Sequence, residues 1–462
     1  MSHQLANAAY WNGPWPAEDG GPERLQAPTG EAGPEVTSHE QFELLANRHA
    51  PGAQMAVRRG PGELYLLRSL FGHRAIDDPA QAVVERINPL TLEPINSSPI
   101  LPAGPWWAGG VAVMADGNLT LVSGSFAHRL DGDSLEVLAS RELSAPRPYN
   151  SFVALSDGTI ITKDIDRSLS SSCRVHALDP STLEDLCDPV ELGESAIARL
   201  SADGSSVYSV ATDHVYRLDW DGTRLTKSSD WNPHYRKGDG KGYGWDPVLA
   251  AGRIWFLDQG RHRFRISMRG SGLDHGPVAL HAIDLADASN HFQLEISGSP
   301  FGSVTNPPLV DPDRMIAVGY DSAGGHVRAF DIPTDPAIAP TPRWSGSFHT
   351  GPHLMRFPDS GELVLFDHRA PWPLHTRAGS RLLESGLSDH LRRSGERKPE
   401  MEAKLAKLIG GEDVALVDIE TGVERSRARL PVFGQSVAFP TAGENRDLIT
   451  ANFNGVQRVG VR

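Results

Sequence analysis

Short apolar runs recur along most of the chain and are separated by polar turns. Runs of about five to six residues favour β-strands, because helices in globular proteins are usually longer. Many of the runs are joined by Asp-Gly or a related pair, and only Gly, Asn and Asp readily adopt the positive φ that such tight turns require. The pattern therefore predicts antiparallel hairpins through most of the chain.

The hairpins form a repeating unit of four apolar runs with two tight turns. The first turn occurs eight times, at Gly60-Pro61-Gly62, Ala115-Asp116-Gly117, Ser156-Asp157-Gly158, Ala202-Asp203-Gly204, Ala251-Gly252, Pro312-Asp313-Arg314, Pro358-Asp359-Ser360-Gly361 and Gly443-Glu444-Asn445. The second turn begins at Asn88, Asp131, Asp179, Asp219, Asp284, Asp331 and Asp418. Each unit is therefore expected to be a four-stranded antiparallel sheet.

Four-stranded units of about 40–50 residues are typical of a β-propeller. We predict an all-β fold, a single β-propeller of eight four-stranded blades over residues 55–462. The eighth unit, from Gln435 to Arg462, supplies only three strands. Because a propeller must close its ring, we expect a strand from the N-terminal extension, residues 1–54, to complete it. Seven blades with an irregular terminus are the alternative.

Two stretches of the repeat carry a family resemblance. The runs FVALSDGTIITKD and VHALDPSTLEDL resemble the quinoprotein-type propeller superfamily, which includes PQQ-dependent dehydrogenases and YVTN-repeat proteins. The resemblance covers about residues 55–462 and implies the fold. A regular tryptophan-docking repeat is missing, with Trp231 and Trp344 near strand ends, and so is the secretion signal of a periplasmic quinone enzyme. We therefore expect a cytoplasmic protein without PQQ.

Composition narrows the class of partner. Hydrophobic residues make up 39% of the 462, enough for a large core, and the 46 Gly and 35 Pro fit repeated turns rather than disorder. Against 44 Lys and Arg stand 58 Asp and Glu, a net charge of −14. This acidic surplus argues against nucleic acid or an anionic membrane as the main partner. We expect a small-molecule ligand instead.

Loop lengths distinguish the two faces of the predicted propeller. Turns between the first and second, and the third and fourth, strands of a blade share one face and are short throughout. The other face, here called the elaborated face, carries the insertions, at residues 164–172, 258–276 and 367–412, and the long connectors at 143–150, 232–246 and 297–306. Long loops on a rigid scaffold are the usual place for binding and catalysis.

The longest insertion changes its apolar period from two to 3.6. Within residues 379–411, in blade 7, apolar stripes run through Leu383, Leu387 and Leu391 and through Met401, Leu405 and Leu408. This spacing predicts a small helical hairpin on the elaborated face. It is either a lid that gates a site or a packing element and homo-oligomer contact.

Equivalent positions of the repeats lie on rings around the axis. The top of the second strand carries Arg68, Ser123, Asp164, Thr212, Asp258, Asp321, Asp367 and Asn452. An aspartate after an apolar run must accept hydrogen bonds, meet a cation or bind a metal. Asp164, Asp258 and Asp321 are therefore candidate ligands for a divalent metal. The alternative is that these carboxylates cap neighbouring loop amides.

A second ring comes from the entrance to each first strand. Together with Asn452, its aromatic, amide and acidic residues are candidate substrate-binding groups: Trp107, Tyr149, Asn150, Trp245, Asp246, Asn306 and Gln435. Apolar walls with a few directed polar groups are typical of a small-molecule pocket. The alternative is that the Trp and Tyr side chains close the top of the core.

Candidate catalytic residues gather in blade 7. His349 and His353 share one strand entrance, and His368 adjoins Asp367. Histidine beside a carboxylate suits a proton-transfer pair or a divalent cation.

These features favour an enzyme acting in a central pocket of the elaborated face. We expect a lyase, isomerase or hydrolase, metal-assisted or not, that takes a small polar or aromatic metabolite. GxSxG, Walker and HExxH motifs are missing. The alternative is a non-catalytic propeller that binds a small ligand or a protein on the same face. A wide axial pocket with converging carboxylates and histidine would support the enzyme, and a plugged mouth the scaffold.

Overall fold

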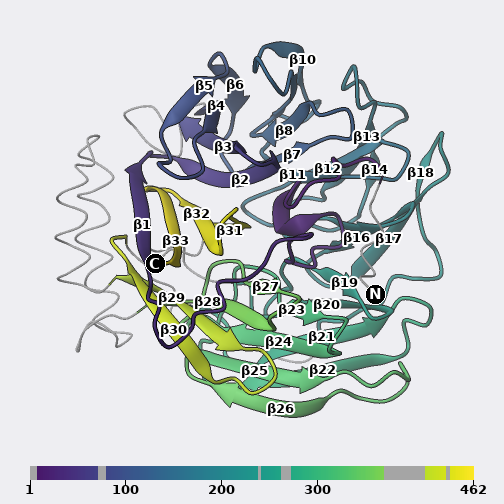
Figure 1. The fold of residues 1–462 in the computed structure, drawn as a ribbon. Coiled ribbons are helices and arrows are strands. Elements are labelled where there is room, and N and C mark those ends of the chain that lie inside the picture. The colour runs from purple at the N-terminus through teal and green to yellow at the C-terminus, as the bar shows by residue number, and fades with distance from the viewer. Residues whose placement is uncertain (1–7, 71–79, 238–240, 262–271, 369–410, 433–437) are drawn as a thin grey trace.

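The computed structural model describes residues 8–70, 80–237, 241–261, 272–368, 411–432 and 438–462. Eight antiparallel sheets surround a central axis (Figure 1). Each is a blade of four strands, and blade 1 has a fifth, β6 (Leu101–Gly104), beside β4. The predicted eight-bladed β-propeller is confirmed, and the seven-bladed alternative is wrong.

The blades follow one another along the chain. Blades 1 to 4 consist of β2 (Ala53–Gly60), β3 (Glu63–Leu70), β4 (Ala80–Ile87) and β5 (Pro94–Ser97); β7 (Gly110–Val113), β8 (Leu119–Ser123), β9 (Phe126–Leu130) and β10 (Val137–Glu142); β11 (Tyr149–Ala154), β12 (Ile160–Asp164), β13 (Arg174–Leu178) and β14 (Val190–Glu191); and β15 (Ser201–Asp203), β16 (Ser206–Val210), β17 (Val215–Trp220) and β18 (Leu225–Lys227). Blades 5 to 7 consist of β19 (Val248–Ala250), β20 (Arg253–Leu257), β21 (Val278–Asp284) and β22 (His291–Ser297); β23 (Leu309–Asp311), β24 (Ile316–Asp321), β25 (His326–Asp331) and β26 (Thr341–Gly346); and β27 (Met355–Phe357), β28 (Glu362–His368), β29 (Glu412–Asp418) and β30 (Glu424–Leu430).

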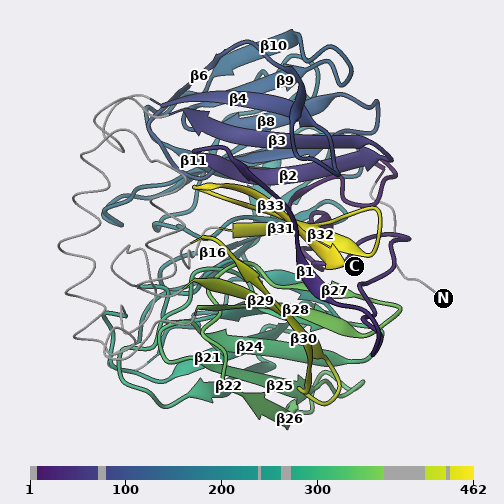
Figure 2. The ribbon, with the colours of Figure 1, turned by 60° about the vertical axis from the view of Figure 1, so that its left-hand side comes forward.

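Blade 8 joins the two ends of the chain. It consists of β31 (Ala438–Ala442), β32 (Asp447–Asn452), β33 (Gly455–Val461) and β1 (Phe42–His49). β1 pairs antiparallel with β33, from Phe42 opposite Val461 to His49 opposite Gly455. Figures 1 and 2 both show β1 beside the C-terminal strands. A strand from the first 54 residues therefore closes the ring.

The predicted helical insertion, residues 379–411, lies outside the described residues except for Gly411. Within the part of the chain that is described, the helical structure is a single turn, η1 (Glu18–Gly20). No helix there is long and apolar enough to cross a membrane.

The core lies between neighbouring blades. Every residue of β28 is buried, because the middle strands of a blade are covered on both faces by the adjacent blades. Leu257, Val318 and Leu365, from blades 5, 6 and 7, belong to one buried cluster. Burial on both faces explains why the sequence shows continuous apolar runs rather than strict alternation.

Turn chemistry agrees with the expected pattern in some of the turns and differs in others. Gly117 and Gly158 adopt positive φ, 83° and 93°, in the predicted Asp-Gly turns. In the second turns of blades 1, 2 and 3 that position is taken by Leu92, Leu135 and Leu183, with φ of 66°, 61° and 63°. All three leucines are completely buried, so the hydrophobic effect offsets the cost of the left-handed conformation. Restricting positive φ to Gly, Asn and Asp was wrong for these turns.

Residues 8–41, here called the N-terminal segment, run across the inner strands before β1 begins. Backbone amides of Arg58, Val113, Ala202, Leu249 and Arg356 donate to carbonyls of this segment at 2.7–2.9 Å. These amides belong to blades 1, 2, 4, 5 and 7. η1 contacts both β7 and β31, and the segment crosses the middle of the ring (Figure 1). The axis of the propeller is therefore occupied by the chain's own N-terminal residues.

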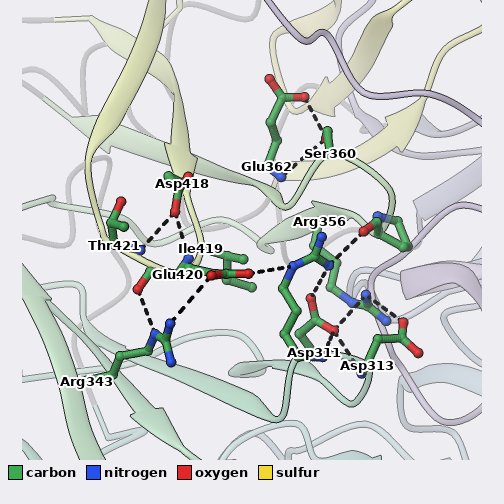
Figure 3. Close-up of polar contacts among 12 residues, drawn as sticks. Asp311, Asp313, Arg343, Arg356, Ser360, Glu362, Asp418, Ile419, Glu420 and Thr421 are labelled. Carbon is green, nitrogen blue, oxygen red and sulfur yellow. Dashed lines mark hydrogen bonds and ion pairs between the residues drawn. The ribbon is translucent and has the colours of Figure 1, made fainter.

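Ion pairs also join blades 6 and 7 (Figure 3). Arg356 of β27 pairs with Asp311 of β23, Nη1 to Oδ1 3.2 Å, and both residues are buried. Arg343 of β26 donates Nε–H to the carbonyl of Glu420 at 2.7 Å and is partly exposed. Two contacts of very different burial thus link the same pair of blades.

Candidate functional site

A cluster of buried charged side chains lies on the propeller axis. The axial cluster consists of Glu18, Asp19, Arg24, Arg199, Asp246 and His353. None of the six is more than 6% exposed. The first three come from the N-terminal segment and the others from blades 4, 5 and 7.

The three blade residues occupy equivalent positions. Arg199, Asp246 and His353 each stand two residues ahead of the first strand of their blade, β15, β19 and β27. The inner strands begin close to the axis, so the repeat itself directs these side chains to one place. The repeated geometry of the blades therefore brings these three side chains together, although they are far apart in the sequence.

A tight turn brings Glu18 and Asp19 to the same place. Asp19 has φ 54° and Gly20 has φ 84°, a pair of left-handed residues that reverses the chain. A Cβ on Gly20 would lie 2.9 Å from the carbonyl oxygen of Ala27, so a glycine is needed there. The carbonyl of Asp19 accepts the N–H of Gln26 at 2.8 Å and closes the loop.

Glu18 lies between two arginines. Its Oε1 is 2.8 Å from Arg24 Nη1 and 3.0 Å from Arg199 Nε. Its Oε2 accepts the hydroxyl of Ser151 at 2.7 Å. Arg24 also pairs with Asp19 Oδ2 at 2.9 Å. These contacts hold Glu18 and Asp19 against the blades.

Within the described part of the structure, His353 and Asp246 each have one polar side-chain atom with a hydrogen-bond partner and one without. His353 Nδ1 lies 2.8 Å from Asp19 Oδ1. Asp246 Oδ1 accepts the backbone N–H of Arg199 at 2.6 Å, and its Oδ2 is 3.7 Å from Arg199 Nη1. Among the described residues, neither His353 Nε2 nor Asp246 Oδ2 has a hydrogen-bond partner. The Phe439 ring covers the imidazole, at 4.2 Å between ring centres.

Burial and nearby charges shift the pKa values of Asp246 and Asp19 in opposite directions. Burial raises the pKa of Asp246, and the positive charges of Arg199, Arg24 and His353 only reduce that rise. Burial also acts to raise the pKa of Asp19, but the charge and hydrogen bond of His353, together with Arg24, outweigh it and lower the pKa. Asp19 is therefore held as a carboxylate.

Three groups of the cluster form a possible cation site. Glu18, Asp246 and His353 each offer one ligand atom, and these atoms all lie within 4.8 Å of one another. Carboxylate oxygens and imidazole nitrogens are common metal ligands. The same three groups can also exchange protons.

A small cavity adjoins the cluster. It measures about 10 Å³ and is lined by Tyr10, Glu18, Arg24, Ser151 and Phe152, among others. This volume is room for about one water molecule, whereas sites for small organic molecules measure about 300–1,000 Å³. A quinone cofactor does not fit there.

Of the residues expected at the strand entrances, Asp246 and His353 reach the axial cluster. Asn150 lies nearby, donating to the carbonyl of Ile197 and accepting from Lys163 Nζ at 3.3 Å. Trp107 is partly buried, beside Trp106 at 6.4 Å between ring centres. Gln435 lies outside the described residues.

Other expected pocket residues are buried in the core. Tyr149 is 0% exposed, and its hydroxyl lies 3.1 Å from His176 Nε2. Trp245 is 5% exposed and stacks on Tyr243. Asn306 is buried, and its side-chain amide donates to the carbonyl of Gly351. The burial of Tyr149 and Trp245 supports the alternative that aromatic side chains close the top of the core.

Asn452 is also not a pocket residue. Its side-chain amide donates to Gln457 Oε1 at 2.6 Å, and its Oδ1 accepts the N–H of Asn454 at 3.0 Å. Both partners lie within blade 8 or its own loop. The side chain shapes the turn between β32 and β33.

The three aspartates expected to bind metal are occupied by their own loops. Asp164 Oδ1 accepts the N–H of Arg174 at 2.7 Å, and Asp258 Oδ1 accepts the N–H of Ala279 at 2.7 Å. Asp321 accepts three backbone N–H groups at 2.9–3.0 Å and the hydroxyl of Ser297. They are dispersed among blades 3, 5 and 6, and none belongs to the set of ligating groups found among the described residues. The loop-capping alternative is what the geometry supports.

The remaining candidates of blade 7 form a separate group. Asp367 Oδ1 accepts the backbone N–H of His349 at 2.9 Å, and its Oδ2 pairs with Arg427 at 2.9 Å. His368 donates its backbone N–H to the carbonyl of His349. His353 pairs with Asp19 of the axial cluster.

Sequence reasoning missed Glu18, Asp19, Arg24, Arg199 and Lys163. Arg199 had a usable signal, since it occupies the strand-entrance position of blade 4. Lys163 is fully buried, and burial lowers its pKa to about 8, partly offset by Cys173 and Asp164. Its Nζ donates to the carbonyl of Ala196 at 2.6 Å. The N-terminal residues had no comparable signal, because they precede the repeats.

Solved structures share this architecture. A quinohemoprotein alcohol dehydrogenase from Comamonas testosteroni aligns with TM-score 0.58 and 10% identity, over 99% of this chain and 81% of that one. A quinohemoprotein alcohol dehydrogenase from Pseudomonas putida HK5 gives 0.57 and 9%, over 100% and 81%. The chain has their fold. The expected quinoprotein-like resemblance is thereby confirmed at the level of fold, while no family model and no curated protein matches the sequence.

Proposed function

We propose that the protein is an enzyme that acts on a small polar metabolite at the axial cluster, by hydrolysis, elimination or isomerisation. One observation carries this proposal: Glu18, Asp246 and His353 come from separate parts of the chain, yet their ligand atoms lie within 4.8 Å at a buried position. Buried carboxylates are costly unless they are paired. Clusters of this kind, with shifted pKa values, concentrate at functional sites.

The side chains of the axial cluster suit reactions that proceed by proton transfer, such as hydrolysis, elimination and isomerisation. Carboxylates and a histidine can move a proton or hold a cation that polarises a carbonyl group. Arg199 and Arg24 add positive charge next to these groups, which favours a substrate or transition state that carries negative charge. Approach along the axis from the elaborated face, where the first strands begin, would bring the substrate to Asp246 and His353.

A non-catalytic propeller is the second candidate, favoured by a specific observation. The N-terminal segment occupies the axis, and Tyr149, Trp245 and Asn306 are buried rather than exposed around a wide pocket. In this case the axial charges would serve only to fix the N-terminal segment to the blades.

Turnover of a mixed metabolite extract in H₂¹⁸O, followed by mass spectrometry, distinguishes the two candidates. The wild-type protein should deplete specific compounds and His353→Gln should not, with ¹⁸O incorporation marking hydrolysis. His128→Gln is the matched control, because His128 is equally buried and its Nε2 bonds the carbonyl of Pro102, away from the axial cluster. Depletion by His353→Gln at the wild-type rate, or an unchanged extract with all three proteins, would contradict the enzyme proposal.

A further inference from the structure

Two buried polar atoms of the axial cluster lack a hydrogen-bond partner in the described part of the chain. His353 Nε2 and Asp246 Oδ2 lack hydrogen-bond partners among the described residues, although both side chains are almost completely buried. A buried polar atom without a partner normally costs about 1–3 kcal/mol. Something that bonds to both atoms would remove that cost.

We propose that Glu18, Asp246 and His353 bind a divalent first-row transition metal ion, Mn²⁺ or Zn²⁺. The inference deepens the proposed function by naming its cofactor, and it rests on that function for the role of the ion in catalysis. Binding of the ion itself is an independent property of the geometry.

The spacing fits ligands around one ion. No hydrogen bond or ion pair joins the imidazole of His353 to Asp246 or Glu18, yet the ligand atoms lie within 4.8 Å of one another. Metal–ligand bonds of about 2.0–2.2 Å place neighbouring ligand atoms roughly 3–4.4 Å apart. The groups are therefore close enough to share a cation after a small adjustment.

The contact between Asp19 and His353 sets the imidazole for coordination. Asp19 Oδ1 lies 2.8 Å from His353 Nδ1, so the carboxylate can accept a hydrogen bond from Nδ1–H. In the neutral imidazole with that proton on Nδ1, Nε2 carries the lone pair. A histidine that ligates a metal almost always donates its other ring N–H to a carboxylate or carbonyl in this way.

The charge of the cluster also leaves a place for a cation. Glu18, Asp19 and Asp246 contribute three negative charges, and Arg24 and Arg199 contribute two positive ones, a balance of 2 − 3 = −1 before His353 is counted. A divalent ion adds positive charge to this cluster.

The donor set selects among metals. Imidazole suits Zn²⁺ and other transition metals, whereas carboxylates suit Mn²⁺, Mg²⁺ and Ca²⁺. A mixed set of one imidazole and two carboxylates favours an ion that accepts both. Three protein ligands leave further positions for water or substrate.

Titration of chelator-treated, full-length protein with MnCl₂, read by electron paramagnetic resonance and calorimetry, and with ZnCl₂ by calorimetry, tests the site. One equivalent should bind. Asp246→Asn, Glu18→Gln and His353→Gln should each weaken binding by roughly 100-fold or more, and Asp19→Asn by about 10–100-fold. Asp321→Asn, a buried carboxylate of blade 6 occupied by loop amides, should bind as wild type does. Thermal melts confirm that each variant is folded.

The outcomes separate the two proposals. Absence of stoichiometric Mn²⁺ and Zn²⁺ binding in folded wild-type protein would overturn the metal site, as would wild-type affinity in folded Asp246→Asn and His353→Gln. Metal binding that these variants abolish supports the site even if no extract compound is consumed, and that result would overturn the proposed enzyme function alone.

Discussion

Glu23 is a carboxyl group that the fold keeps from ionising easily. It lies in the N-terminal segment, where its carbonyl accepts the N–H of Leu249. Burial of the side chain raises its pKa to about 7, and the negative charge of Asp203 adds to the rise. The charged form is therefore less favourable in the folded protein than in the unfolded chain.

This shift predicts a pH-dependent gain for Glu23→Gln. A carboxyl whose folded pKa is raised destabilises the protein increasingly as pH rises from about 4.5 to 7. The variant should match wild type near pH 4.5 and exceed it by roughly 1–2 kcal/mol above pH 7, after allowing for partial exposure. Urea unfolding at several pH values measures the difference. Glu184→Gln, on an exposed side chain, should show no such trend, and a gain independent of pH would contradict the explanation.

Site residues could be predicted from the sequence where they occupy equivalent positions of the repeated blades. Asp246 and His353 were selected because strand entrances of equivalent blades share a ring. The same rule applied to blade 4 would have selected Arg199. For Tyr149 and Trp245, the sequence gives no measure of whether an aromatic side chain at that position turns outward or into the core. Asp19 pairs with a histidine 334 positions away, a contact that no local pattern carries.

The contact between β23 and β27 shows how single ion pairs join blades. Arg356→Met removes the partner of buried Asp311 (Figure 3). Removal of one member of a buried pair is strongly destabilising, since a charge remains buried. Asp311 keeps the 3.2 Å contact to Arg314 and two backbone amides, so we expect a loss of about 2–4 kcal/mol in chemical denaturation.

Arg343→Met is the matched control for this prediction. Arg343 joins the same two blades through Glu420, but its side chain is 32% exposed and that of Glu420 54%. Exposed pairs contribute about 0–1 kcal/mol, so this variant should remain within about 1 kcal/mol of wild type. Equal losses in the two variants would show that burial does not decide the strength of these links.

The strands were predictable from short apolar runs and from the turns. Apolar runs bounded by Asp-Gly predicted the hairpins, because glycine at positive φ is a strictly local requirement. The turns with Leu92, Leu135 and Leu183 differ, since burial of these leucines in the finished core offsets the cost of their positive φ. η1 was not predictable either: its shape depends on close packing of Gly20 against Ala27, outside any repeat.

At the scale of the whole molecule, the count of repeats predicted the ring, and the shortage of one strand predicted that an N-terminal strand closes it. β1 fills that place beside β33. The path of residues 8–41 before β1 could not be predicted, because its hydrogen bonds go to five blades far apart in sequence. The candidate site depends on that path. The sequence pattern could therefore indicate only the residues that the blades contribute to the axial cluster.

Deletions from the N-terminus should separate the axial role of the N-terminal segment from ring closure. Removal of residues 1–30 eliminates Glu18, Asp19 and Arg24 and leaves His353, Asp246 and Arg199 with fewer partners on the axis. We expect a folded, monomeric protein with a lower melting temperature, because β1 and its pairing with β33 remain. Removal of residues 1–49 also deletes β1 and leaves the edge of β33 unpaired. An unpaired strand edge can form hydrogen bonds with strands of other chains.

The longer deletion should therefore aggregate or form oligomers, whereas the shorter one should not. Size-exclusion chromatography and thermal melts measure both effects. If the two deletions have the same melting temperature and both remain monomeric, β1 does not close the ring in an energetically important way. If the shorter deletion melts as wild type does, the axial contacts do not stabilise the propeller, and the three buried carboxylates on the axis would be explained by the proposed site alone.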